Sequence, residues 1–227
     1  MKNHVFRNRH EAGEKLAESL ELYRNDPKAI VLGLPGAGLA VAAAVSNRLN
    51  LPLDVFISRT LRAPCHLECT LGAITETGII YMDEGTICTQ NWLYRELRAY
   101  VARESEIQEA EIARLRHVYR GGQNFLNVAG RRVILVDEGI TSGATFFAAV
   151  DSLRTLDAAS VIGAIPVGPG DVLREMHYKV DELVALIRPD KFGQVRDYYE
   201  DFRQVSDANA AKLLREEHKC QAFKRAG

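Results

Sequence analysis

Short apolar runs alternate with longer segments of helical periodicity along the chain. A continuous apolar run bounded by turn residues is typical of a strand that is buried on both faces of a parallel sheet. Such runs predict strands at residues 29–34, 53–58, 133–136, 161–167 and 181–187. Because helices are expected between these strands, the order of elements predicts an α/β fold with a parallel sheet.

Helical periodicity occupies most of the segments between the strands. Residues 11–23 place Leu16, Leu20 and Tyr23 on one stripe, which is typical of an amphipathic helix. The pattern predicts further helices at residues 36–49, at 141–156, before the strand at 181–187 and after Phe202.

Two features are additions to this simple alternation. Alternating apolar residues at 71–82, with Gly78 at the turn, predict a hairpin. Residues 90–119 contain no Gly or Pro and are rich in helix formers, so they predict one long helix. This helix is expected to be a solvated flank or a subunit contact, and a homodimer is therefore one possible assembly.

The composition agrees with a folded globular protein. Of the 227 residues, 47% are apolar and 26% are charged, which are ordinary values for such proteins. No linker divides the chain, so we expect residues 1–227 to form a single domain. The formal net charge of −1 gives no general field for nucleic acid or for an acidic membrane, and neither partner is expected.

No segment predicts export, membrane insertion or a metal site. The apolar runs, such as residues 40–45, are far shorter than the roughly 20 residues of a membrane span. The charged N-terminus has no apolar stretch behind it, so a cytoplasmic location is expected. The four cysteines are too few for a disulfide framework, and Cys65-His66-x-x-Cys69 lacks a second pair of ligands at zinc-finger spacing.

The segment at 133–145, VILVDEGITSGAT, carries the strongest chemical signal. A buried strand brings Asp137 and Glu138 to its carboxyl end, where ligands bind in open α/β sheets. The following loop begins a helix, whose free N–H groups and positive dipole end favour a phosphate. Carboxylates beside a phosphate site suit a ribose 5-phosphate, because they can accept hydrogen bonds from its hydroxyls. The alternative is a buried strand, an acidic N-cap and a plain helix start, which any α/β protein may contain.

This segment resembles the signature of the type I phosphoribosyltransferases over thirteen contiguous residues. The resemblance implies that Asp137 and Glu138 hold the ribose hydroxyls of phosphoribosyl pyrophosphate. The residues that it assigns to the 5-phosphate are Gly139, Ile140, Thr141, Ser142, Gly143, Ala144 and Thr145. Further segments are similar to a bacterial group of stand-alone predicted phosphoribosyltransferases, namely residues 6–9, 32–38, 53–55, 59, 63–64, 72–74, 119–122, 166–169 and 201–206.

The glycine loop after the first strand has two readings. Gly36 and Gly38 could form half of a dinucleotide fingerprint, but the third glycine would fall at Val41, and Arg59 rather than an acid ends the next predicted strand. The resemblance instead implies that Gly36, Ala37 and Gly38 bind the pyrophosphate, which glycine lets approach the backbone closely.

Two positions depart from the family pattern at this part of the site. The family commonly has Arg where Gly36 stands and Lys where Thr60 stands, so two cations for the leaving group are missing. Arg59 and Arg62 are the candidates to replace them, since an arginine fork suits a pyrophosphate. Arg62 could equally be a surface arginine beside a strand end.

The resemblance implies a type I phosphoribosyltransferase-like parallel sheet flanked by helices, with strand order 3-2-1-4-5, a small hood, and the hairpin and long helix as an insertion. It implies transfer of ribose 5-phosphate from phosphoribosyl pyrophosphate to an acceptor base, with Mg²⁺ bound through the pyrophosphate of the substrate. Asp137, Glu138 and Arg59 would be the catalytic residues. The alternative is a regulatory module that binds phosphoribosyl pyrophosphate or a nucleotide without turnover.

Overall fold

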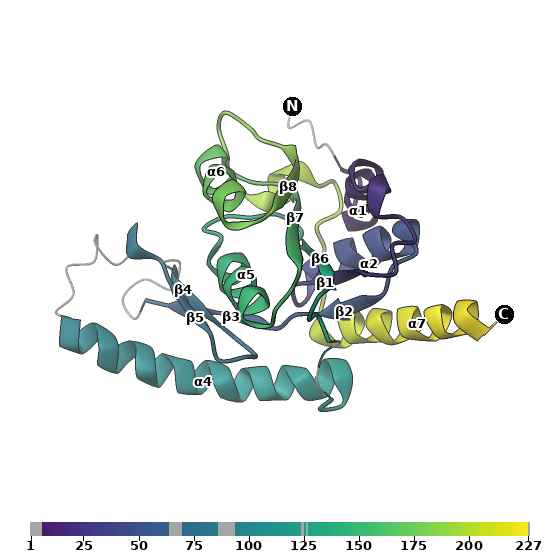
Figure 1. The fold of residues 1–227 in the computed structure, drawn as a ribbon. Coiled ribbons are helices and arrows are strands. Elements are labelled where there is room, and N and C mark those ends of the chain that lie inside the picture. Colours follow the sequence, from purple (N-terminus) through teal and green to yellow (C-terminus); the bar gives the residue numbers. More distant parts are fainter. Residues whose placement is uncertain (1–5, 64–69, 86–93, 124, 126, 227) are drawn as a thin grey trace.

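A parallel sheet between two layers of helices forms the centre of the computed structural model, which describes residues 6–63, 70–85, 94–123, 125 and 127–226 (Figure 1). A smaller antiparallel sheet lies beside it, against the long helix α4 (Tyr94–Arg120). The predicted α/β class is therefore confirmed. The segment that contains Cys65 and Cys69 falls outside the described residues.

Five strands form the parallel sheet in the order β2-β1-β6-β7-β8. They are β1 (Ala29–Gly33), β2 (Leu53–Val55), β6 (Arg132–Val136), β7 (Ser160–Val167) and β8 (Glu182–Ile187). Taken in chain order, these strands run 2-1-3-4-5, so the implied order 3-2-1-4-5 is wrong. The reason is that the chain leaves this sheet after β2, and its next strand pairs elsewhere.

Each face of the parallel sheet is covered by its own helices because alternate side chains point to opposite faces. Val31 and Ile134 pack in one apolar cluster with α1 (Arg9–Ser19), α2 (Ala37–Leu49) and α7 (Asp207–Ala226). On the other face, β1 and β6 pack against α5 (Ala144–Thr155) and α6 (Gly170–Lys179).

The helix predicted at 11–23 differs from the structure at both ends. Asn8 caps α1 by accepting a hydrogen bond from the Glu11 N–H, so the helix begins at Arg9. It ends at Ser19, and a 3₁₀ turn, η1 (Glu21–Tyr23), follows.

The predicted strand at 53–58 is divided between the two sheets. After β2, the chain turns away at Phe56 and Ile57 and continues as β3 (Ser58–Arg62). This strand pairs with β4 (Thr70–Thr75), which pairs in turn with β5 (Ile80–Met82). The predicted hairpin is confirmed as β4 and β5, and Gly78 supplies the positive φ of 83° at its turn.

The helix predicted at 90–119 is confirmed from Tyr94 on as α4 (Tyr94–Arg120), which extends along one side of the molecule (Figure 1), while residues 90–93 lie outside the described residues. Its last residue, Arg120, forms a buried ion pair with Glu76 at the hairpin turn, and Glu76 also accepts a hydrogen bond from the Ile57 N–H at 2.8 Å. Burial raises the pKa of Glu76, although the charge of Arg120 opposes this effect. This pair joins α4 to the small sheet.

No helix in the described part of the chain is long and apolar enough to span a membrane.

Replacing Arg120 by Met is expected to destabilise the protein by about 3–5 kcal/mol, because the carboxylate of Glu76 would stay buried without its partner. Arg120→Met combined with Glu76→Gln should recover much of this loss, since no buried charge remains. Denaturant unfolding measures both variants. Arg24→Met, which removes an exposed ion pair with Glu21, is the control and should change stability by less than about 1 kcal/mol. A similarly small change for Arg120→Met would contradict the prediction.

Candidate functional site

The glycine loop and the acidic pair start from neighbouring strands at the same edge of the sheet. Gly33 and Val136 are paired in register, and the Leu34 N–H donates to the Val136 carbonyl at 3.0 Å. An added Cβ at Gly38 would lie only 2.7 Å from Oδ1 of Asp137. Glycine is therefore required at Gly38, because any side chain would displace the carboxylate.

Asp137 has the most strongly perturbed carboxyl group of the site. Burial raises the pKa of Asp137 to about 7, and the neighbouring charge of Glu138 adds to the rise. A hydrogen bond from the Glu138 N–H to Oδ1, at 2.8 Å, works in the opposite direction. This carboxyl group therefore titrates near neutral pH.

Glu138 differs from Asp137 because it has a charged partner. Arg9, from the start of α1, donates from Nε to Oε2 of Glu138 at 2.6 Å. The guanidinium also donates to the Arg203 carbonyl at 2.8 Å and lies 4.3 Å from the centroid of the Phe202 ring. Burial raises the pKa of Glu138, and Arg9 counteracts part of the rise. Arg9 therefore fixes the direction of this carboxylate.

The segments next to Arg9 form a small cap over the acidic pair, which we call the hood (residues 6–8 and 195–202). Phe6 and Tyr199 form a parallel bridge, and their rings lie 5.3 Å apart. The Tyr199 hydroxyl donates to the Glu138 carbonyl at 2.6 Å. These contacts attach the two segments directly to the end of β6.

The loop from Gly139 to Thr145 leads from the acids into α5. An added Cβ at Gly139 would lie 2.6 Å from the side chain of Val195, which requires glycine there. The predicted helix start at residue 141 moves to Ala144, because Gly143 caps the helix with a positive φ of 80°. Ile140 donates its N–H to the Val167 carbonyl. For the N–H groups of residues 141–146, the described part of the chain offers no acceptor.

The glycine loop has a similar set of N–H groups. Gly36 has a positive φ of 77° and caps α2, and its N–H donates to the Tyr119 hydroxyl at 2.9 Å. The N–H groups of residues 37–40 have no acceptor among the residues with described positions. An arginine at Gly36, as in the family pattern, would be strained at this φ.

The structure does not bring Arg59 to this group of residues. Its Nε donates to the side-chain oxygen of Gln108 on α4 at 3.1 Å. In β3, Arg59 pairs with Ile74, while Thr60 pairs with Ala73, which packs against the start of α5. Thr60 therefore lies on the face of the small sheet toward α5, and Arg59 lies on the opposite face. Arg62 is exposed at the end of β3.

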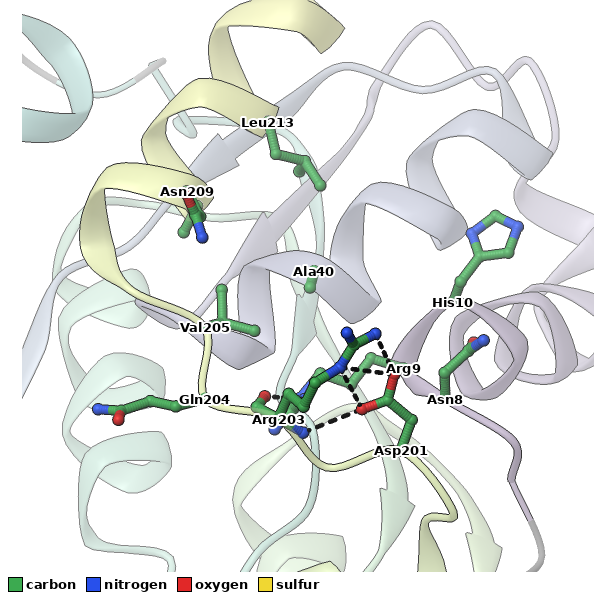
Figure 2. A pocket seen from close by; sticks show the side chains of 11 residues that line it. Asn8, Arg9, His10, Ala40, Asp201, Arg203, Gln204, Val205, Asn209 and Leu213 are labelled. Carbon is green, nitrogen blue, oxygen red and sulfur yellow. Dashed lines mark hydrogen bonds and ion pairs between the residues drawn. The ribbon is translucent and has the colours of Figure 1, made fainter.

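A cavity of about 450 Å³ is lined by Arg9, the partner of Glu138, and by residues of α2, α7 and the segment before α7 (Figure 2). Arg9 and Arg203 lie on the same side of it, and Ala40 from α2 and Leu213 from α7 lie across from them. Because Arg9 also binds Glu138, this cavity is separated from the carboxylate by one side chain.

The sequence did not assign roles to Arg9, Tyr119 or Tyr199. Arg9 and Tyr119 lie in segments that resemble the stand-alone phosphoribosyltransferases, and this was the only signal for them. The described residues contain no group of three or more His, Cys, Asp or Glu side chains that could hold a metal ion.

Together, the parallel sheet, the acidic pair at the end of β6 and the helix start after it form a candidate ligand site at the carboxyl ends of the strands of an α/β sheet. The chain matches the family described as "Phosphoribosyl transferase domain" over residues 6–203, and it belongs to this family.

Two relatives from Mycobacterium tuberculosis are similar along most of the chain. They are named "Putative phosphoribosyl transferase Rv0571c" (strain H37Rv) and "Putative phosphoribosyl transferase MT0597" (strain CDC 1551), and each is 33% identical over 215 residues, or 95% of this chain. The match covers 47% of each relative, so the chain spans about half the length of these proteins.

A solved structure shares the fold along almost the whole chain. The crystal structure of TT1426 from Thermus thermophilus superposes with a TM-score of 0.76 at 32% sequence identity. The match covers 93% of this chain and 98% of that one. The predicted type I phosphoribosyltransferase-like fold is thereby confirmed.

The raised pKa of Asp137 predicts that Asp137→Asn stabilises the fold at pH 8. The folded pKa is about 7 and the ordinary value is 3.8, so between these pH values the folded state retains a proton that the unfolded state has lost. The free energy of unfolding of the wild type therefore falls as pH rises from 3.8 to about 7. The amide side chain of the variant does not ionise, so this loss of stability is absent in the variant. We expect a rise in Tm of at least about 2 °C at pH 8 and no rise near pH 4.

Thermal unfolding across this pH range measures the effect. Asp201→Asn is the matched control, because Asp201 is a partly exposed carboxylate whose pKa is lowered by its hydrogen bonds with Arg203. This variant should not gain stability at pH 8. A lower Tm for Asp137→Asn than for wild type at pH 8 would show that the carboxylate is not destabilised by burial.

Proposed function

We propose that the protein transfers ribose 5-phosphate from phosphoribosyl pyrophosphate to a nitrogenous base or a related nucleophile and releases pyrophosphate. The observation that carries this proposal is the adjacency of two carboxylates, Asp137 and Glu138, to the N–H groups of residues 141–146, for which no acceptor is described. These groups match the two ends of a ribose 5-phosphate.

The phosphate end fits the start of α5. N–H groups that have no acceptor among the described residues lie at the start of this helix, next to the positive end of its dipole, and this is the usual arrangement for a bound phosphate. The hydroxyls of Thr141, Ser142 and Thr145 can donate further hydrogen bonds. We assign the loop from Gly139 to Thr145 to the 5-phosphate.

The ribose end fits the acidic pair. An ionised carboxylate accepts hydrogen bonds, and bonds of this kind to charged groups contribute about 1.5–3 kcal/mol each. Arg9 holds Glu138 in position. The carboxyl group of Asp137 titrates near pH 7. In this proposal the 2- and 3-hydroxyls of the ribose donate to these two side chains.

The leaving group fits the glycine loop. The N–H groups of residues 37–40 lie at the start of α2, next to Asp137. They would receive the pyrophosphate, with Gly36, Ala37 and Gly38 allowing its close approach. Arg59 would have to leave Gln108 to contribute, and Arg62 is the other candidate cation.

Magnesium fits this arrangement as an ion carried by the substrate. Mg²⁺ prefers oxygen ligands and usually keeps several waters, together with one or two carboxylates and substrate phosphates. Asp137 and Glu138 are the carboxylates near the proposed site of the pyrophosphate. When bound, Mg²⁺ would neutralise charge that develops on the leaving group.

The reaction needs no nucleophile from the protein. The bond from C1 of the ribose to the pyrophosphate oxygen breaks and its electron pair leaves with the pyrophosphate. The acceptor nitrogen forms the new bond to C1 and loses its proton. The protein contributes by holding both reactants in line and by directing N–H groups at the departing charge.

The alternative function is a regulatory module that binds phosphoribosyl pyrophosphate without turnover. The placement of Arg59 favours this alternative, because its guanidinium binds Gln108 on the face of the small sheet away from α5. This module would keep the ribose 5-phosphate site and lack the stabilised leaving group.

We predict that Asp137→Asn combined with Glu138→Gln weakens binding of phosphoribosyl pyrophosphate by about a hundredfold or more, since two charge-assisted hydrogen bonds are lost. Calorimetric titration with Mg²⁺ present measures the affinity. The matched control is Asp181→Asn with Glu182→Gln, an adjacent acidic pair at the amino end of β8, on the opposite edge of the sheet. The control should bind as wild type does.

Turnover is tested by measuring pyrophosphate release with purines, pyrimidines and their precursors as acceptors. Release with at least one acceptor, lost in the double variant of Asp137 and Glu138, is the expected result. Tight binding without release for any acceptor would establish the regulatory module instead. Unchanged affinity in that double variant would refute the assignment of the acidic pair.

A further inference from the structure

The long helix α4 reaches the glycine loop through one residue. The hydroxyl of Tyr119, in the last turn of α4, accepts the hydrogen bond from the Gly36 N–H at 2.9 Å. Tyr119 is only 3% exposed, and its ring packs in the apolar cluster that contains α2. The contact joins residues that are 83 positions apart in the chain.

The Tyr119 hydroxyl is itself held in position. It donates to Oδ1 of Asp207, the first residue of α7, at 3.2 Å. Arg114 binds the other oxygen of Asp207 at 2.8 Å and also forms an ion pair with Glu111. Burial raises the pKa of Tyr119, and the charge of Asp207 raises it further. The hydroxyl therefore stays protonated, so it donates to Asp207 and accepts from Gly36.

Packing holds Gly36 weakly. An added Cβ there would have only the Val205 carbonyl oxygen within 4 Å, at 3.8 Å. Its positive φ of 77° is a conformation that glycine can leave easily, since its backbone is freer than that of other residues. The hydrogen bond to Tyr119 is thus the main described restraint on the direction of this turn.

We propose that Tyr119 is a positioning residue for the pyrophosphate: by binding the Gly36 N–H, it keeps the next N–H groups, those of residues 37–40, directed at one place. The inference rests on the proposed function and gives α4 a role in it. Tyr119 touches no reacting atom. It acts through the glycine loop, by its hydrogen bond with the Gly36 N–H.

The variant Tyr119→Phe retains the buried ring and loses the hydroxyl. We expect its affinity for inorganic pyrophosphate with Mg²⁺ to fall by about three- to tenfold, the range that corresponds to one hydrogen bond. Its affinity for ribose 5-phosphate should not change, because that ligand occupies Asp137, Glu138 and the start of α5. Calorimetric titration with each of the two probes measures this split.

Tyr23→Phe is the matched control. Tyr23 is also buried, and its hydroxyl donates to a carboxylate, that of Glu182 at the amino end of β8. This variant should bind both probes as wild type does, even if its Tm falls by as much as that of Tyr119→Phe. The Gly36 amide should exchange its hydrogen faster in Tyr119→Phe than in wild type.

The possible outcomes separate this inference from the proposed function. Failure of the wild type to bind ribose 5-phosphate would refute the proposed function. If the wild type binds ribose 5-phosphate but not pyrophosphate, or if Tyr119→Phe binds pyrophosphate as tightly as wild type, the role of Tyr119 is refuted. Equal weakening of both probes, or an unchanged exchange rate at Gly36, would also overturn it by showing that the hydroxyl does not hold the loop.

Discussion

Two adjacent carboxylates at the end of β6 repel each other and lose hydration when they are buried, and the surrounding structure compensates for this cost unequally. Glu138 receives Arg9, a charged donor at 2.6 Å, whereas Asp137 receives a backbone N–H and has a pKa of about 7. Within the hood, the ring of Phe202 packs against the guanidinium of Arg9. The hydroxyl of Tyr199 donates a hydrogen bond to the Glu138 carbonyl. A buried carboxylate needs a charged partner, and residues 6–8 and 195–202 are arranged so that Arg9 can be that partner for Glu138.

The same constraint explains the glycines of the site. Gly38 allows α2 to begin in contact with the carboxylate of Asp137, and Gly139 allows the chain to pass beneath Val195. These close approaches leave two helix starts, those of α2 and α5, near one pair of acids. The proposed substrate has phosphate groups at both ends and hydroxyls between them. This order matches the two helix starts with the acidic pair between them, and the proposed function rests on this match.

The sequence predicted those parts of the fold and site that depend on local patterns. Buried strands such as β1 and β6 are continuous apolar runs, and the two acids and the loop after them form a contiguous segment. The sequence could not show that residues 53–58 are divided between two sheets. Both parts look like strands, and they differ only in the strands with which they pair. Arg9 and Glu138 are 129 positions apart, so no spacing rule could pair them. Arg59 was expected near the pyrophosphate, but the register of β3 directs it to α4.

The proposed function requires that the acids and the start of α5 form a ribose 5-phosphate site before any ligand binds. The most direct measurement is a titration of isotope-labelled protein with ribose 5-phosphate, followed by the chemical shifts of the backbone amides. We expect large shifts that saturate for the amides of residues 141–146, whereas ribose without the phosphate should leave those shifts unchanged. If saturating ribose 5-phosphate left the amide shifts of residues 141–146 at their values in the free protein, the proposed function would be contradicted.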